Sequence, residues 1–143
     1  MAQGKRRATK AASIWWATHF ILVMERIKPK KTGPRYFVWE NVYLVRARSS
    51  AEARRNGDRL GRSEVIPDAT LRWNGSPARL AYGGVRKVIS CAEGLDRPTD
   101  GLGGDVATIR DGDEATYSTF LIPDLASLRR LIRGDPVSLV YEK

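Results

Sequence analysis

Two segments of alternating apolar residues, joined by a short basic loop, constrain the fold of this chain most strongly. The first segment, residues 14–27, places apolar side chains on both faces of a strand, which predicts a central strand with cover on each side. The second segment, residues 36–47, has the same alternation. Between them, KPKKTGPR (residues 28–35) is a loop by its prolines and glycine. The sequence therefore predicts a long β-hairpin with a basic tip.

Two helices are predicted from capping signals and apolar periodicity. Ser49 and Glu52 have the spacing of a capping box, so a helix begins there. We expect this helix to run to about Leu60, with Gly61 as the residue that follows its C-terminus. The second helix follows Pro123-Asp124, has apolar residues recurring on one face, and ends at Gly134.

Further strands are predicted downstream of the first helix. Asn74-Gly75 is a dipeptide typical of tight hairpin turns, because both central positions need positive φ, whereas Pro77 shortly after it leaves a looser turn as the alternative. A strand region over residues 80–91 is interrupted by Gly83-Gly84, which suits a bulge or bend. Two more strands are expected at residues 115–122 and 137–141.

This pattern predicts one α+β domain over residues 13–143, behind a flexible basic arm at residues 1–12. The element order is ββα-ββ(β)αβ. We expect a mainly antiparallel sheet with two helices packed on one face.

Charge is distributed unevenly along the chain. Residues 1–87 carry 19 Lys and Arg against 6 Asp and Glu, a net charge of +13, and the remaining residues carry −4. The excess gathers in three patches. The three patches are the arm (Lys5, Arg6, Arg7 and Lys10), the hairpin tip (Lys28, Lys30, Lys31 and Arg35) and one face of the first helix (Arg55, Arg59 and Arg62). Such patches attract polyanions, so nucleic acid or an acidic protein surface is the expected partner.

A membrane partner is not expected, although the apolar run at residues 14–24 follows a basic start. These eleven residues are too few to span a bilayer, which needs roughly 20. They also include Thr18 and His19, and no small-residue cleavage site follows them. A buried strand is the favoured interpretation.

The chain has one cysteine, Cys91, and one histidine, His19. A lone cysteine forms no internal disulfide, which indicates a reducing compartment, and we expect a cytoplasmic protein. A single histidine inside an apolar strand excludes multi-histidine metal sites and favours a structural role. The glycine-rich residues 101–105 match neither a P-loop nor a dinucleotide fingerprint. Neither a catalytic constellation nor a cofactor is expected.

Among the sequence patterns, acidic loop residues give the strongest indication of enzymatic activity. Asp111, Asp113 and Glu114 stand together, and carboxylate oxygens are ligands of Mg²⁺ and Ca²⁺. The segment lacks the twelve-residue pattern of a calcium-binding EF-hand, and Asp-Gly clusters are ordinary turn residues. The turn is the favoured interpretation, and a metal site is the alternative.

Four segments together resemble a known family. They are W-x-A at residues 15–17, VWENVYLVRA at 38–47, SSAEARR at 49–55 and DGDEATYS at 111–118. The chain resembles, over residues 14–120, the uncharacterised bacterial family called domain of unknown function four-two-eight-eight. This resemblance implies a small bacterial α+β domain with no established activity, and it supplies no catalytic residues.

Three hypotheses about function follow from these patterns. The first is a small non-enzymatic binding module whose basic surface docks on nucleic acid or an acidic protein, as an accessory component of a larger assembly. The second is an immunity-like or antitoxin-like partner that works through protein contacts, in a homo-oligomer or a hetero-complex. The third is a metal-dependent hydrolase that uses the acidic turn at Asp111, Asp113 and Glu114.

Overall fold

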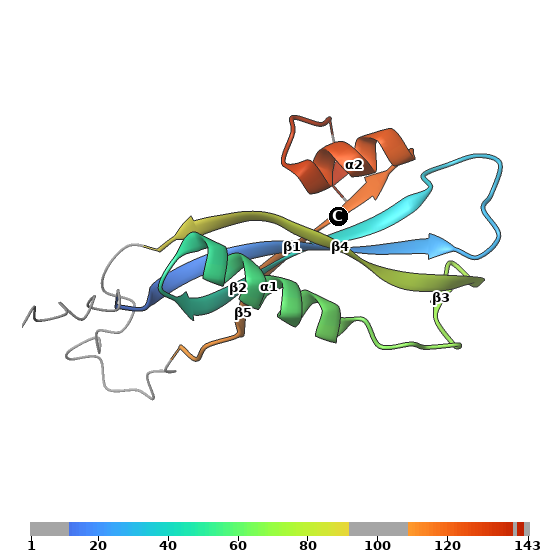
Figure 1. The fold of residues 1–143 in the computed structure, drawn as a ribbon. Helices are drawn as coiled ribbons and strands as arrows, with labels where there is room; N and C mark the ends of the chain where they lie inside the picture. The colour runs from blue at the N-terminus through green and yellow to red at the C-terminus, as the bar shows by residue number, and fades with distance from the viewer. Residues whose placement is uncertain (1–11, 92–108, 139, 142–143) are drawn as a thin grey trace, which may run out of the picture.

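The computed structural model describes residues 12–91, 109–138 and 140–141 (Figure 1). Along the chain the elements are β1 (Ile14–Arg26), β2 (Tyr36–Ala47), α1 (Ser50–Glu64), β3 (Arg72–Trp73), β4 (Ser76–Ser90), β5 (Asp113–Ile122), α2 (Leu125–Arg133) and β6 (Val140–Tyr141). The strands form one sheet in the order β3-β4-β1-β2-β5-β6, and all neighbours pair antiparallel. The predicted α+β class with a mainly antiparallel sheet is therefore confirmed.

Strand β1 lies in the middle of the sheet, where it pairs with β2 on one side and β4 on the other. Its side chains alternate between the two faces as the sequence predicted. Phe20 belongs to an apolar cluster against which Leu60 of α1 packs, whereas the next residue, Ile21, clusters with Leu131 of α2. Phe20 and Ile21 are both fully buried, so each face of β1 has its own core.

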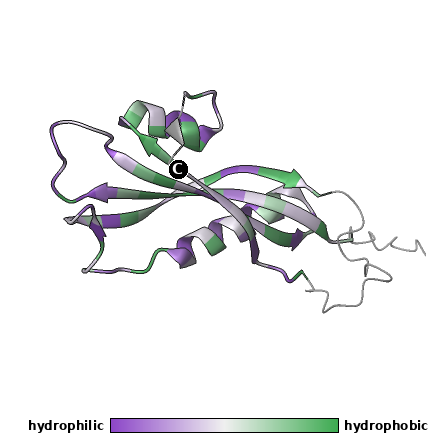
Figure 2. Cartoon of the chain, turned by 180° about the vertical axis from the view of Figure 1, so that it is seen from behind, coloured by the Kyte–Doolittle hydropathy of each residue, from purple (hydrophilic) through white to green (hydrophobic). Residues whose placement is uncertain are grey.

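The two helices cover opposite faces of the sheet, which differs from the expected placement on one face. Figure 1 shows α1 below the sheet and α2 above it, and Figure 2 shows the same separation from behind. The reason lies in β1, because both of its faces are apolar. Helices on a single face would leave half of these side chains against water.

Helix α1 begins where the capping signal predicted and ends one turn later than expected. The side chain of Ser49 accepts a hydrogen bond from the backbone N–H of Glu52 at 3.1 Å. Gly61 is not the residue after the helix but a buried position inside it, against the ring of Tyr82. A glycine here lets the helix lie close to the sheet. Packing against the sheet stabilises the helix beyond Gly61, although glycine often ends helices.

Two tyrosines of the sheet bind acidic residues of α1. The hydroxyl of Tyr43 donates to Oε1 of Glu64 at 2.8 Å, and that of Tyr82 donates to Oδ1 of Asp58. Burial and the neighbouring carboxylate raise the pKa of each phenol above its ordinary value of 10.0. These contacts fix α1 on its face of the sheet.

Strand β4 contains the bulge predicted at the glycine pair and a second one. Ile21 pairs with Gly84 and Leu22 with Tyr82, so Gly83 has no partner in β1. A second shift in register, where β1 passes from His19 to Phe20, leaves Arg86 without a β1 partner as well. A bulged residue aims its side chain differently from the regular strand.

The remaining elements follow the sequence closely, except at the C-terminal end. Asn74 and Gly75 have φ of 47° and 78° and join β3 to β4 in the predicted tight hairpin. Helix α2 ends at Gly134, as predicted; the structure adds that Gly134 is in the left-handed conformation and that the Asp124 side chain caps the start of the helix. The final strand is shorter than the predicted 137–141 and comprises Val140–Tyr141.

Candidate anion-binding site

The loop between β1 and β2 is held at both ends by backbone hydrogen bonds. The N–H of Ile27 donates to the carbonyl of Pro77 at 3.0 Å, and the N–H of Arg35 donates to the carbonyl of Ile122 at 3.0 Å. Gly33 adopts a positive φ of 90° in the turn between them, which glycine does without strain. The loop lies at one end of the sheet and is coloured mainly as hydrophilic in Figure 2. Its basic residues are therefore carried on an anchored segment.

This loop surrounds a hollow of about 370 Å³, which we call the tip cavity. Its lining consists of Glu25, Arg26, Pro29, Lys30, Lys31, Gly33, Pro34, Arg35 and Pro123. Three predicted cations, Lys30, Lys31 and Arg35, are thus brought together, and we call them the tip cations. Arg26, which lies outside the three predicted basic patches, lines the same cavity.

The tip cavity has an excess of positive charge. Its one acidic residue, Glu25, is bound by Arg79, whose Nη2 and Nε lie 2.6 and 2.9 Å from Oε1. Within residues 12–91 and 109–138, no carboxylate lies within ion-pair distance of a tip cation. A concave surface with several unneutralised cations focuses positive potential and attracts anions.

Arg26 occupies an unusual position beside the cavity. It is the last residue of β1, and its guanidinium carbon lies 3.9 Å from the centroid of the Trp73 ring. Arg26 is only 8% exposed, and Trp73 only 6%. The sequence shows a charged residue at the end of an apolar strand. It does not show that this residue stacks on the indole of Trp73, because Trp73 belongs to β3, far along the chain.

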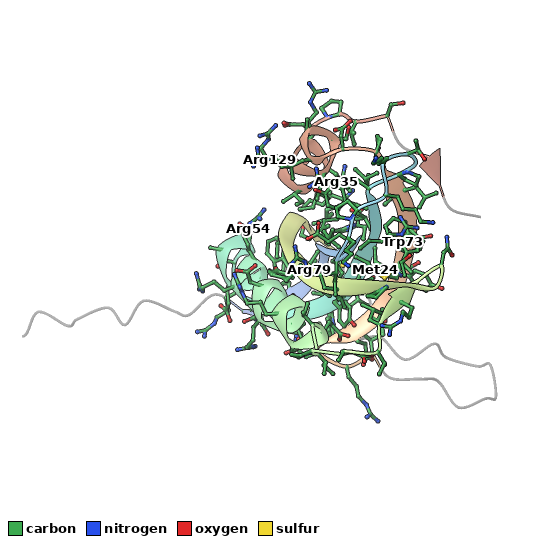
Figure 3. The ribbon with its side chains drawn as sticks, turned by 90° about the vertical axis from the view of Figure 1, so that its right-hand side faces the viewer. Met24, Arg35, Arg54, Trp73, Arg79 and Arg129 are labelled. Atoms are coloured by element: carbon green, nitrogen blue, oxygen red, sulfur yellow. The ribbon has the colours of Figure 1, made fainter. Side chains whose placement is uncertain are left out.

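The other predicted cations do not join the tip cavity. The arm residues Lys5, Arg6, Arg7 and Lys10 lie outside the described residues. Lys28 lines a neighbouring hollow with Ile27, Ser76 and Pro77. Arg55, Arg59 and Arg62 belong to α1, where Arg62 lies 5.0 Å from the Tyr82 ring. Figure 3 views the molecule from the end that carries the loop and shows Arg35 in the loop and Arg54 on α1.

A second polar cluster lies on the face of the sheet that α2 covers. Oε1 of Glu40 is 3.0 Å from Nδ1 of His19 and 2.9 Å from Nη1 of Arg86. Nε of Arg86 also donates to the backbone carbonyl of Leu131 in α2 at 3.0 Å. Burial alone would raise the pKa of Glu40, but the hydrogen bonds from His19 and Arg86 outweigh it and lower the pKa below 4.5.

This cluster connects β1, β2, β4 and α2. Glu40 and Arg86 also border an open hollow beside residues 134–137. The structural role expected for His19 is consistent with its position, because its ring is hydrogen-bonded within the sheet. We take the cluster as a buried charge network that positions α2.

The acidic turn has the geometry of a turn. Oδ1 of Asp111 accepts from the backbone N–H of Arg46 at 3.0 Å, and Oδ2 of Asp113 accepts from that of Arg110 at 2.8 Å. The described part of the chain contains no group of three or more His, Cys, Asp or Glu arranged to hold a metal ion. The arrangement of Asp111, Asp113 and Glu114 therefore gives no support to the metal-site alternative.

Cys91 follows the end of β4 and is partly buried. Burial raises the pKa of its thiol, which disfavours the reactive thiolate. The position is consistent with the structural role that its isolation in the sequence suggested.

Comparisons of this chain with protein-family models, with curated proteins and with solved structures find no match. In the described part of the chain, no helix combines the length and the apolar character that crossing a bilayer requires.

Proposed function

We propose that this protein is a binding module that docks on nucleic acid through the tip cavity of the β1–β2 hairpin. The observation that carries the proposal is the gathering of Lys30, Lys31 and Arg35 around one hollow whose only carboxylate is already paired with Arg79. Phosphates along a nucleic acid are closely and regularly spaced, at about one charge per 1.7 Å of duplex axis. Clustered cations on one anchored loop suit such a ligand.

The expected mode of binding is contact with phosphates rather than recognition of bases. Tyr36, the aromatic residue next to Arg35, is 4% exposed and so cannot stack on a base. Lysine and arginine side chains that neutralise phosphates release condensed counterions, which favours binding without reading the sequence. The proposed activity is therefore general nucleic-acid binding with a strong dependence on salt.

The experiment compares two triple variants with equal change in charge. One carries Lys30→Gln, Lys31→Gln and Arg35→Gln, and its matched control carries Arg55→Gln, Arg59→Gln and Arg62→Gln on α1. Binding of labelled single-stranded and double-stranded DNA of about 20 nucleotides is followed by fluorescence anisotropy at low salt. We expect the tip variant to lose roughly tenfold or more in affinity and the α1 variant to lose much less.

Two results would overturn the proposal. Equal losses in both variants mean that net charge, and not the tip cavity, drives binding. Equal affinity of the unaltered protein for a glutamate-rich peptide and for DNA means that the cavity binds acidic proteins as well as it binds phosphates. Circular dichroism of all variants checks that each one is folded.

A further inference from the structure

Arg26 is a buried cation for which the described part of the chain provides no anion. Its residue is 8% exposed, and its Nε is fully buried without a hydrogen-bond partner. Its guanidinium stacks on Trp73, with its carbon 3.9 Å from the ring centroid. A buried charged group without hydrogen-bond partners is costly, so such groups are ordinarily paired.

Two other arginines of the sheet, both more exposed than Arg26, each bind a carboxylate. Arg86 binds Oε1 of Glu40 and the carbonyl of Leu131. Arg79 binds the carboxylate of Glu25, which is the chain neighbour of Arg26. The nearest acid along the chain is therefore already bound, and Arg26 is left with an aromatic face but no acceptor.

The surroundings of Arg26 favour a ligand with negatively charged oxygens. The indole of Trp73 is itself fixed, because it is 6% exposed and meets the ring of Phe37 edge-on at 6.2 Å. A guanidinium stacked on a fixed ring is preorganised, and its planar set of donors matches the oxygens of a phosphate. Arg26 also lines the tip cavity, so an anion held by the tip cations lies next to it.

We infer that Arg26, stacked on Trp73, is the seat of one phosphate group in the tip cavity. This inference rests on the proposed function, because the phosphate belongs to the bound nucleic acid. The tip cations attract the strand through charge, and Arg26 fixes one phosphate by its geometry. A lysine at this position keeps the charge but loses the planar set of donors, so it does not replace the arginine.

The experiment uses the full chain and three variants. Arg26→Lys keeps the charge, and Arg26→Met removes it while retaining an unbranched side chain beside Trp73. Arg72→Met is the matched control, since it removes an exposed cation of β3 from the same end of the sheet, outside the lining of the tip cavity. Nuclear magnetic resonance of isotope-labelled protein follows the Nε–H of Arg26 and the indole N–H of Trp73 while inorganic phosphate replaces chloride at constant ionic strength. Binding of single-stranded DNA is measured in parallel by anisotropy.

We expect phosphate to shift both resonances in the unaltered protein, and both Arg26 variants to bind DNA roughly tenfold more weakly. The Arg72 variant should change affinity less than either of them. Thermal unfolding confirms that the variants are folded, and Arg26→Lys is the decisive variant because it keeps the charge.

The outcomes separate this inference from the proposed function. If the Arg26 variants bind DNA as well as the unaltered protein while the tip variant does not, Arg26 does not bind a phosphate of the DNA, and the proposed function stands. If phosphate shifts the two resonances but DNA does not bind, the site at Arg26 binds free phosphate and the nucleic-acid proposal fails. If neither ligand binds, both are overturned.

Discussion

Arg86 in β4 and Glu40 in β2 form an ion pair across the intervening strand β1, with 2.9 Å between Nη1 and Oε1. The bulge in β4 frees Arg86 from regular pairing with β1, and Arg86 then also binds the carbonyl of Leu131. One buried carboxylate thus links two strands that are not neighbours and, through Arg86, helix α2.

We predict that Glu40→Gln lowers the free energy of unfolding by about 2 kcal/mol at neutral pH, because Arg86 loses its buried counterion. The pKa of Glu40 is lowered in the folded protein. Its contribution to stability is therefore present above the pKa of the unfolded carboxyl group and is lost as pH falls through the folded pKa. Urea denaturation over a series of pH values should show the difference between the two proteins shrinking below about pH 4. A constant difference down to the lowest pH would contradict this explanation.

We predict that Gly61→Ala destabilises the protein by about 1–3 kcal/mol, even though alanine favours helices. A Cβ at this position overlaps the Tyr82 ring and lies 3.1 Å from Cδ2 of Phe20. Arg55→Ala, on the exposed side of the same helix, is the control and should change stability by less than about 0.5 kcal/mol. Chemical denaturation measures both, and a stabilised Gly61→Ala variant would show that α1 does not pack as described.

We predict that Tyr43→Phe lowers the free energy of unfolding by about 1 kcal/mol at neutral pH, through loss of the hydrogen bond to Glu64. Burial, together with Glu64, raises the pKa of Tyr43 above 10.0. This contribution is present below the pKa of an unfolded tyrosine and is lost as pH rises towards the folded pKa, so the variant should lose less stability on the alkaline side. Denaturation between about pH 7 and pH 11 tests the trend. Tyr117→Phe, at a position 61% exposed, should behave like the unaltered protein.

We predict that neutralising the three tip cations reduces the salt dependence of DNA binding as well as the affinity. Each phosphate contact with single-stranded DNA contributes about 0.7 to the slope of log affinity against log salt. The tip variant should therefore show a slope smaller by about 1–2 than that of the unaltered protein, and the α1 control should keep most of its slope. Anisotropy titrations at several salt concentrations give both values. An unchanged slope in the tip variant would mean that these residues do not contact phosphates.

The candidate site could be predicted only in part from the sequence. The basic tip was visible because Lys30, Lys31 and Arg35 are close together along the chain. The sequence did not predict that Arg55, Arg59 and Arg62 lie apart from these three cations, since this depends on which face of the sheet α1 covers. Arg26 was missed because its environment is made by Trp73, which reaches it only through the pairing of β3 with β4.

Local sequence patterns were sufficient to predict most strands, turns and helix starts, because these depend on side-chain alternation and on local hydrogen bonds. The hairpin of β1 and β2, the Ser49 cap and the Asn74-Gly75 turn are of this kind. The two apolar faces of β1 predicted cover on each side, but the tertiary structure was needed to show that α1 covers one face and α2 the other, that Gly61 stays inside α1 and that Arg26 stacks on Trp73. Each of these depends on close packing between residues far apart along the chain, and a local sequence pattern carries no information about such contacts.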